Sequence, residues 1–472
     1  MAIDLLLVNA PTEGIYGMVQ KASTPQPPLG LAYVAGYAQK RGYTVKVLDC
    51  DTEKFTVDGF KTLLNQLQPK VVGFSSTTPV ITTIIEMAAL VKTWDDRIVI
   101  IAGGPHATAL PEETLRRSRI DIVVRGEGEK TTVDILGSLT AGTSLKDVKG
   151  ISFREKDNII SNPDRELLSD IDELPFPARH LLPTQKYRAS YYLGSYGEKF
   201  ANIIATRGCP YRCIFCGQDI IFKHTVRLRR PESIVEEIEG IRRKFGINLF
   251  CFEDSTFTAN PELVREICEE ISSRRLGIRW GAMGRANLAD EKLYRIMKDS
   301  GCLLLCYGVE SGNQRILERI NKNITLDEVR KAVGLAKNVG IPINTSFILG
   351  LPGETKDTIM ETIDFAIELD ADYASFSLAT PYPGTEFYAM AMKEGVDLSD
   401  WSRFRLARYL EPLYVPKGLT VSELKFYYRL AYKRFYMRPR YIMKSFAKIK
   451  SVADLIYKIQ VGFSLFSWYR KV

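Results

Sequence analysis

Residues 206–216 read Thr-Arg-Gly-Cys-Pro-Tyr-Arg-Cys-Ile-Phe-Cys, and the three cysteines in this stretch are the strongest chemical signal in the chain. Cys209, Cys213 and Cys216 have the spacing C-x3-C-x2-C. Three thiolates in one loop predict a cubane [4Fe-4S] cluster with one iron left without a protein ligand, because four irons take four thiolates. A zinc site is the alternative, but zinc sites close with four ligands, and only His224 lies near, at an unusual spacing. The pattern therefore predicts a cluster whose open iron binds a substrate or cofactor.

On both sides of this loop, short apolar runs alternate with helix-length segments. Nearly continuous apolar runs predict strands that are covered on both faces. Between them apolar residues recur at helical spacing, and Pro231, Asn260 and the Thr325-x-x-Glu328 pattern mark helix starts. Six such units predict a partial (β/α)6 barrel of the TIM type over residues 201–385, with strands at 203–206, 249–252, 278–282, 303–307, 343–348 and 373–378.

Residues 1–140 show the same alternation and predict a separate α/β domain, a Rossmann-like doubly wound parallel sheet of about five strands. Such a sheet binds ligands at the carboxyl ends of its strands. The turns at these ends are small, hydroxylic or glycine-rich, which lets backbone amides approach a large ligand. No turn has a complete G-x-G-x-x-G, so a dinucleotide is not favoured. The candidate binding residues are Asn9, Pro11, Thr12, Ser75, Ser76, Thr77, Thr78, Gly103, Gly104, His106, Gly126, Glu127 and Gly128.

The cysteine spacing, the Gly208-Cys209-Pro210 entry and Phe215 before the third cysteine resemble the signature loop of the radical S-adenosylmethionine (SAM) superfamily. The turns of the first domain, together with residues 27–30 and Leu48-Asp49, resemble the cobalamin-binding domain that precedes many radical SAM domains. This resemblance covers nearly the whole chain. It implies three cofactors, a [4Fe-4S] cluster, SAM and cobalamin, and it makes the turn residues named above cobalamin contacts.

The ends of the barrel strands carry the residue types that SAM needs, which are polar partners for its charged groups and ribose and an apolar slot for adenine. An acidic residue after a strand is more often a helix cap, and Arg285 paired with Asp254 is the plain alternative to a ligand role. Tyr307 and Tyr382 are candidate catalytic residues of the cavity. The resemblance places SAM at Phe215, Glu253, Asp254, Arg285, Glu310, Ser311 and Leu351.

One motif departs from classical cobalamin domains. They place D-x-H-x-x-G after the first strand, whereas this chain has Asn9-x-Pro11-x-x-Gly14. Proline cannot coordinate cobalt, so we expect cobalamin with its own base displaced and no strong protein ligand below the cobalt. His106 follows a different strand, and a turn histidine of this kind is expected to form a hydrogen bond rather than to bind cobalt.

The resemblance implies a cobalamin-dependent methyltransferase that acts on an unactivated carbon. In this family cob(I)alamin takes a methyl group from one SAM, and a second SAM on the open iron yields the 5′-deoxyadenosyl radical that removes hydrogen from the substrate. Oxidative cyclisation or rearrangement with the same cofactors is the first alternative. A non-catalytic cobalamin-binding sensor is the second, but it leaves the cysteine loop without a role.

The other cysteines argue against a further cluster. Cys251, Cys268, Cys302 and Cys306 are expected in the core, where free cysteine is common. Methylthiotransferases need three more cluster cysteines in the N-terminal domain, and only Cys50 is present there. Eight cysteines without regular pairing, and no signal segment or apolar run that spans a bilayer, predict a cytoplasmic protein. The oxygen-sensitive cluster that the resemblance implies fits this reducing compartment and an anaerobic enzyme.

Charge is concentrated at the C-terminus. Residues 401–472 carry a net charge of +13, so the rest of the chain carries −5. We expect a connector over residues 141–200 and a basic helical region over 386–472, whose interleaved aromatic residues permit peripheral membrane contact. A solvated helix that closes the barrel mouth is the plain alternative. The expected partners are a small hydrophobic substrate of isoprenoid or tetrapyrrole type and a one-electron donor such as flavodoxin or ferredoxin; nucleic acid is not expected.

Overall fold

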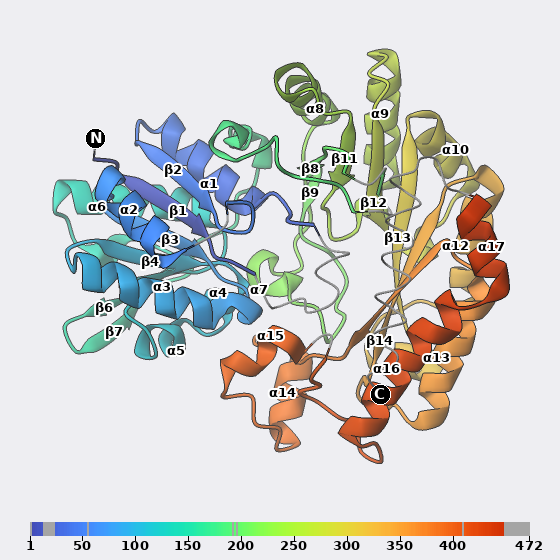
Figure 1. The fold of residues 1–472 in the computed structure, drawn as a ribbon. Coiled ribbons are helices and arrows are strands. Elements are labelled where there is room, and N and C mark those ends of the chain that lie inside the picture. The colour runs from blue at the N-terminus through green and yellow to red at the C-terminus, as the bar shows by residue number, and fades with distance from the viewer. Residues whose placement is uncertain are drawn as a thin grey trace.

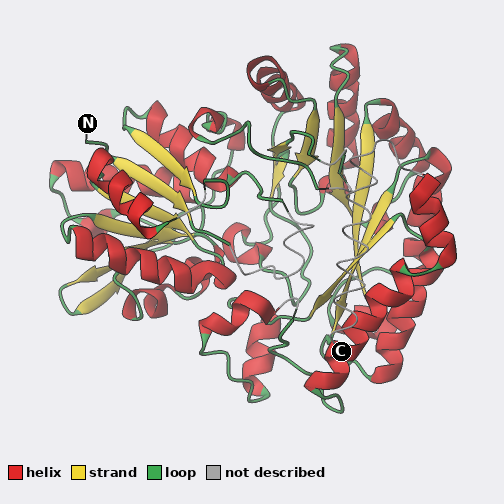
Figure 2. Ribbon diagram, viewed as in Figure 1, coloured by secondary structure: helices red, strands yellow, loops and turns green. Residues whose placement is uncertain are grey.

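The computed structural model describes residues 2–12, 24–53, 56–190, 193–194, 197–407 and 410–447, so Gly14 and residues 448–472 of the basic tail lie outside the described residues. Two α/β units lie side by side, with the last helices along the outer side of the second unit (Figure 1). Each unit has one main sheet flanked by helices (Figure 2). Both main sheets are mostly parallel, so the predicted fold class is confirmed.

The first sheet has the strand order β2-β1-β3-β4-β5-β6-β7. Its parallel strands are β1 (Leu5–Asn9), β2 (Val45–Asp49), β3 (Val71–Ser75), β4 (Val99–Gly103) and β5 (Ile122–Val124). One face packs on α1 (Leu29–Lys40) and α6 (Gly128–Ala141), and the other on α2 (Val57–Leu67), α3 (Ile81–Trp94), α4 (Pro105–Ala109) and α5 (Pro111–Arg116). The chain switches sides of the sheet between β1 and β3, which is where sheets of this type bind ligands.

Two antiparallel strands, β6 (Ile151–Glu155) and β7 (Asn158–Ser161), extend this sheet beyond residue 140. Ile151 and Phe153 of β6 are buried, and β6 pairs with β5, the last of the parallel strands. The stretch predicted as a connector therefore begins with part of the first sheet, because so short a hairpin leaves little periodic signal. Residues 162–200, called the strap below, contact both units.

The second sheet has the order β15-β14-β13-β12-β11-β8, with every neighbouring pair parallel. Its strands are β8 (Ala201–Ile203), β11 (Leu249–Phe252), β12 (Arg279–Gly284), β13 (Cys302–Glu310), β14 (Ile343–Leu349) and β15 (Tyr373–Leu378). The outer helices are α8 (Pro231–Phe245), α9 (Pro261–Ser273), α10 (Glu291–Asp299), α12 (Leu326–Val339) and α13 (Lys356–Leu369). The predicted helix starts are confirmed: Pro231 opens α8, Asn260 accepts from the Leu263 amide, and Thr325 forms a capping box with Glu328.

The inner face of this open barrel is less densely packed than the outer face. Along β13 and β14, buried residues such as Phe347 and Val309 alternate with partly exposed ones such as Cys306, Asn344 and Ser346. The buried set joins the main core with the outer helices. At the amino ends of the strands, strap residues including Tyr187 and Leu193 pack on Leu249 and Leu304. The inner face is therefore open toward the carboxyl ends.

The C-terminal region consists of α14 (Glu386–Lys393), α15 (Phe404–Ala407), α16 (Val421–Tyr436) and α17 (Pro439–Ala447). Helix α16 lies beside the edge strand β15. Two tyrosines of the helix form hydrogen bonds with backbone groups of this strand. Tyr432 Oη accepts from the Phe376 amide at 3.2 Å and donates to the carbonyl of the same residue at 3.0 Å, and Tyr436 does the same for Ala374. Part of the aromatic tail thus protects a sheet edge. Within the described residues, no helix is long and apolar enough to cross a membrane.

Candidate functional site

The cysteine loop begins at β9 (Thr206–Arg207) and ends before α7 (Gln218–Phe222). Gly208 has φ +95°, and a side chain there would collide with the Thr225 carbonyl, so the turn requires glycine. Cys209, Cys213 and Cys216 are free and partly exposed. Burial raises the pKa of the Cys216 thiol, and the other two cysteines lie close enough to affect it electrostatically.

The donor set of this loop fits a cluster better than a single zinc ion. No group of three or more His, Cys, Asp or Glu residues in the described part of the chain is arranged to hold one metal ion. His224 Nε2 lies 3.0 Å from Asp219 Oδ2, so the proposed fourth zinc ligand has another partner. A cubane spreads its thiolates over different irons, which suits three neighbouring thiols that do not converge on one point.

Asp254 supports the loop rather than facing a ligand. Its buried carboxyl group accepts hydrogen bonds from the Ala205 amide at 3.1 Å and from the Thr206 hydroxyl at 2.7 Å. Burial raises its pKa to about 6 despite these hydrogen bonds. On the other side of the loop, the Ile214 amide donates to the Ile320 carbonyl at 3.1 Å. The backbone that carries the cysteines is therefore fixed at both ends.

Two buried cations flank the cluster loop, and neither pairs with Asp254. The Arg285 guanidinium lies 3.5 Å from the centre of the Tyr211 ring and donates to the Lys322 carbonyl. Lys322 Nζ forms a buried ion pair with Glu310 Oε1 at 2.7 Å and lies 5.9 Å from the Phe215 ring. Sequence reasoning missed Lys322, because it follows α11 (Gln314–Arg319) in a turn without a recognisable motif.

The other predicted SAM residues differ in access. Glu253 is exposed by its accessible surface, and the protein around it raises the pKa of its carboxyl group by partial desolvation. Ser311 is fully buried and its hydroxyl lies 3.1 Å from Thr362 Oγ1 on α13. Leu351 is also fully buried. Glu253 and the partly buried Phe215 are therefore the members of the predicted set that a ligand can reach directly.

Two further expectations concern tyrosines and core cysteines. Tyr307 is buried, and its hydroxyl contacts that of Tyr294 on the outer helix α10. This corrects the expectation that Tyr307 lines the cavity. Tyr382 is partly buried with its ring 6.0 Å from that of Phe404. Cys268 and Cys302 are buried as expected, whereas Cys251 and Cys306 are partly exposed on the inner face.

The carboxyl edge of the first sheet carries the predicted cobalamin contacts. Several are already hydrogen-bonded: Asn9 Nδ2 donates to Asp49 Oδ1 at 2.8 Å, Thr12 Oγ1 donates to Asp51 Oδ1 at 2.9 Å, and Ser76 Oγ donates to the Gly103 carbonyl at 2.7 Å. Gly104 has φ +95° and passes close to the Ser76 backbone. The members of the set that keep exposed surface include Pro11, Ser75, Thr77, Gly103, Gly126 and Gly128.

His106 lies at this edge as a buried, neutral imidazole. Its Nδ1 lies 3.1 Å from Thr78 Oγ1, and its ring packs edge-on against Trp401 with centroids 4.5 Å apart. Burial lowers its pKa to about 3. Nε2 has no hydrogen-bond partner among the described residues. A small-residue edge with one unpaired buried nitrogen fits a large ligand that brings its own hydrogen-bonding groups.

The cluster loop and the edge of the first sheet adjoin. Helix α7, which starts two residues after Cys216, packs against α4, which follows the turn at Gly104. Gly384, in the loop after β15, lies so near α7 and α4 that a side chain at this position would meet Ile220 and Ala109. Three segments that are distant in sequence therefore meet between the two units, where α7 is visible in the centre of Figure 1.

Comparisons with known proteins agree with this geometry. Residues 203–366 match the model of the radical SAM superfamily, and residues 16–136 match that of the B12 binding domain. An uncharacterized methyltransferase of Pyrococcus horikoshii is 36% identical over 444 residues, which cover 94% of each chain. The anaerobic magnesium-protoporphyrin IX monomethyl ester cyclase of Rubrivivax gelatinosus is 29% identical over 90% of this chain and 76% of its own length. Among solved structures, the radical SAM methyltransferase TsrM of Kitasatospora setae, with cobalamin and a [4Fe-4S] cluster bound, has a TM-score of 0.72 at 18% identity, over 93% of this chain and 90% of that one.

Proposed function

Because this chain belongs to the radical SAM family whose members carry a cobalamin-binding domain, we propose that it is a methyltransferase acting on an unactivated carbon of a small hydrophobic substrate. The cofactors of this family are a [4Fe-4S] cluster, SAM and cobalamin. The observation that carries the proposal is the meeting of the three-cysteine loop with the carboxyl edge of the first sheet, through α7, α4 and the loop at Gly384. Two cofactors held at these places can act on one substrate between them.

The residues of this chain would hold and shield the cofactors. Cys209, Cys213 and Cys216 would bind three irons of the cluster, and the Glu253 carboxylate suits the ammonium group of SAM. When bound, the cluster and SAM supply radical chemistry for hydrogen abstraction, and cobalamin supplies the methyl group. The strap packs apolar residues on the amino end of the barrel, which would limit the entry of water from that side.

Isotope labelling tests the proposal. The full chain is reconstituted without air with iron, sulfide and cobalamin, and is incubated with SAM that carries a trideuterated methyl group and with candidate isoprenoid lipids and tetrapyrroles. The proposal expects a product that gains the intact trideuterated methyl group, detected by mass spectrometry. Cys213→Ala is the control and should lose both bound iron and product. Release of 5′-deoxyadenosine with no labelled product from any substrate class would count against methyl transfer.

Oxidative cyclisation is a second candidate, favoured by the similarity to the Rubrivivax gelatinosus cyclase over most of this chain. The two functions share every cofactor, so only the product separates them. A ring-closed product without deuterium from SAM would replace the methyltransferase proposal by this one.

We also propose a one-electron donor of the flavodoxin or ferredoxin type as the partner that reduces the cluster. Reduced flavodoxin and a chemical reductant are compared under the labelling conditions. Turnover with both supports a protein donor, whereas turnover with the chemical reductant alone argues against the flavodoxin type.

Peripheral membrane contact is proposed for the end of the chain. Met437 and Met443 are 48% and 72% exposed on the last described turns, next to the exposed Arg440. Exposed apolar side chains beside cations suit an anionic lipid surface. Flotation with anionic liposomes is compared for the full chain and for Met443→Ser with Met437→Ser. Equal recovery of both chains in the soluble fraction would contradict this contact.

A further inference from the structure

Arg207 links the cluster loop to the first domain. It stands directly before Gly208 and Cys209 on β9, and its guanidinium is buried. One nitrogen lies 2.7 Å from Glu127 Oε1, and the other lies 2.5 Å from Glu129 Oε1. The guanidinium also lies 5.0 Å from the centre of the Tyr33 ring on α1. Each of these three partners belongs to the predicted cobalamin domain.

A second arginine shares the carboxylate of Glu127 with Arg207. Arg227 on β10 (Arg227–Leu228) is the cross-strand neighbour of Arg207 in a two-stranded antiparallel ladder. Two like charges directly opposite each other repel. Glu127 lies between them, because its other oxygen is 2.7 Å from Arg227. A carboxylate from the first domain therefore offsets the repulsion in the short ladder that starts the cluster loop.

Glu127 also connects the strap and a predicted cobalamin turn. It precedes α6 in the Gly126–Gly128 turn at the carboxyl edge of the first sheet. Its Oε2 accepts a hydrogen bond from the Leu168 amide of the strap at 2.9 Å. A single side chain thus contacts the cluster-loop ladder and the strap while it belongs to the edge where cobalamin is expected.

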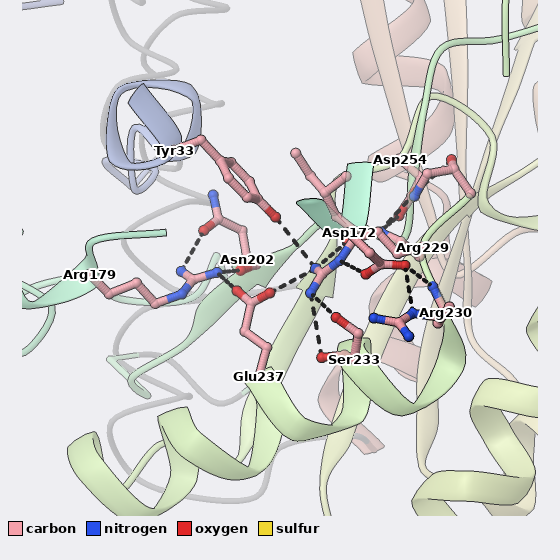
Figure 3. Close-up of polar contacts among 12 residues, drawn as sticks. Tyr33, Asp172, Arg179, Asn202, Arg229, Arg230, Ser233, Glu237 and Asp254 are labelled. Carbon is pink, nitrogen blue, oxygen red and sulfur yellow. Dashed lines mark hydrogen bonds and ion pairs between the residues drawn. The ribbon is translucent and has the colours of Figure 1, made fainter. Parts of the chain in front are cut away.

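A neighbouring network also consists of buried arginines that share a carboxylate, but it lies between the strap and the barrel. Arg179 of the strap lies 2.8 Å from Glu237 Oε1 on α8, and Arg229 lies 2.7 Å from the other oxygen of Glu237 (Figure 3). Arg229 also reaches Tyr33 Oη at 3.4 Å and Asp172 Oδ1 at 3.8 Å. Arg179 additionally donates to the carbonyl of Asn202 on β8, at the start of the barrel. Arg179 therefore joins strap and barrel by a pair as buried as that of Arg207, and none of its side-chain polar partners among the described residues lies in the cysteine loop.

We propose that Arg207 is a positioning residue, whose two-carboxylate bond to Glu127 and Glu129 fixes the cluster loop relative to the cobalamin-binding edge. The inference rests on the proposed function, because it matters only if two cofactors act on one carbon. Arginine suits this role since its planar fork holds two carboxylates in one orientation, whereas the single ammonium of lysine does not fix an orientation. Small displacements of reacting groups lower reaction rates by large factors. The bond of Arg207 to the two carboxylates would therefore determine what fraction of the 5′-deoxyadenosyl radicals leads to methylated product.

The experiment compares Arg207→Lys with the matched control Arg179→Lys in reconstituted full-length chain. The first readout needs no turnover: pulsed electron paramagnetic resonance measures the distance distribution between cob(II)alamin and the reduced cluster. The second readout is methylated product per 5′-deoxyadenosine. For Arg207→Lys we expect a broadened distance distribution and a ratio lower by roughly tenfold, at unchanged iron and cobalamin content. For Arg179→Lys we expect both readouts to match the unaltered chain, even where its melting temperature falls.

The outcomes separate this inference from the proposed function. Unchanged distance distribution and ratio in Arg207→Lys would overturn the positioning role, as would equal changes in both variants, which would indicate a general domain contact. If Arg207→Lys does not fold, Glu129→Gln replaces it, because this variant keeps the shape and the Glu127 bridge while removing one of the two carboxylates. If the unaltered chain yields no methylated product, the proposed function fails, and the distance distribution still decides on Arg207.

Discussion

Buried carboxyl groups lie both between the two domains and at the mouth of the barrel, but the pKa of Glu127 is lowered in the first place and that of Glu354 is raised in the second. Burial by itself raises the pKa of Glu127, yet the hydrogen bond from Arg227 and the charge of Arg207 hold it below its ordinary value. Glu354, at the carboxyl end of β14, accepts hydrogen bonds from the backbone amides of Gly350 and Leu351 at 2.5 and 2.9 Å. Burial raises the pKa of Glu354 to about 8.

This difference separates a contact that is constant with pH from one that titrates. Near neutral pH the Glu127 carboxylate stays ionised and keeps both arginines, so this contact between the domains does not depend on a proton. At the barrel mouth, Glu354 keeps a proton in the folded chain that it would lose in the unfolded chain. The charge of Glu127 at the domain contact is therefore constant near neutral pH, whereas Glu354 at the barrel mouth makes the free energy of unfolding depend on pH.

The largest effect is expected from Glu127→Gln. This change leaves Arg207 with Glu129 alone and removes the carboxylate partner of Arg227. Breaking a buried ion pair by removal of one partner costs about 3–5 kcal/mol, because the other charge stays buried without compensation. We expect a loss of this size in the free energy of unfolding, measured by urea denaturation at pH 7.5.

The matched control for Glu127→Gln is Glu113→Gln. Glu113 pairs with Arg117 at 2.9 Å on the surface, with about 40% of each side chain exposed. Exposed pairs of this kind contribute about 0.5 kcal/mol. If the two variants lose similar free energy, the contact between the domains is no stronger than a surface ion pair and the comparison fails.

A smaller effect with a defined pH profile is expected from Glu354→Gln. Between about pH 4.5 and 8 the carboxyl group is protonated in the folded chain and ionised in the unfolded chain. Unfolding then releases a proton, so the free energy of unfolding falls as the pH rises through this window. Glutamine lacks this proton, so the stability of the unaltered chain relative to Glu354→Gln should fall by roughly 2 kcal/mol between pH 6 and 8.5.

Urea denaturation at several pH values checks this profile. The deficit of Glu127→Gln should stay constant over the same range, because the pKa of Glu127 lies below it. Stability curves of Glu354→Gln and the unaltered chain that run parallel from pH 6 to 8.5 would show that Glu354 is ionised when folded, and would remove the contrast between the two regions.

The fold was largely predictable from the sequence because strand and helix periods repeat over six units of the barrel. The strand positions at 249–252 and 373–378 agree with β11 and β15 at both ends. The hairpin of β6 and β7 was not predicted, since each of its strands has at most five residues and its first strand, β6, pairs with β5, more than twenty residues earlier in the chain. Short antiparallel additions are specified by tertiary packing rather than by local pattern.

The candidate site was less predictable, because the side chains of consecutive residues along a strand, or just after it, point in different directions. Glu253 and Asp254 are adjacent and both acidic, yet Glu253 is exposed whereas Asp254 is buried against the amides of β9. Sequence alone gives both the same role. The arginine at position 207 also appeared only as part of the cysteine motif, because its carboxylate partners lie about eighty residues earlier in the chain.

The smallest effect is expected at the edge of the barrel sheet. The contact there involves no charged group, so it tests whether the difference in pH dependence between the two regions comes from their carboxyl groups. Tyr432→Phe removes the hydroxyl that serves both the amide and the carbonyl of Phe376. Losing a neutral hydrogen-bond partner costs about 1 kcal/mol, and the contact joins a phenol hydroxyl to a peptide group, which are neutral types of group near pH 7. We therefore expect a constant loss of this size across the range, measured as for Glu354→Gln. Tyr427→Phe, on the same helix, is the control with an expected change within about 0.5 kcal/mol. A pH-dependent loss in Tyr432→Phe would mean that the edge of β15 is coupled to a titrating group, and that pH sensitivity is not confined to the buried carboxyl groups at the barrel mouth.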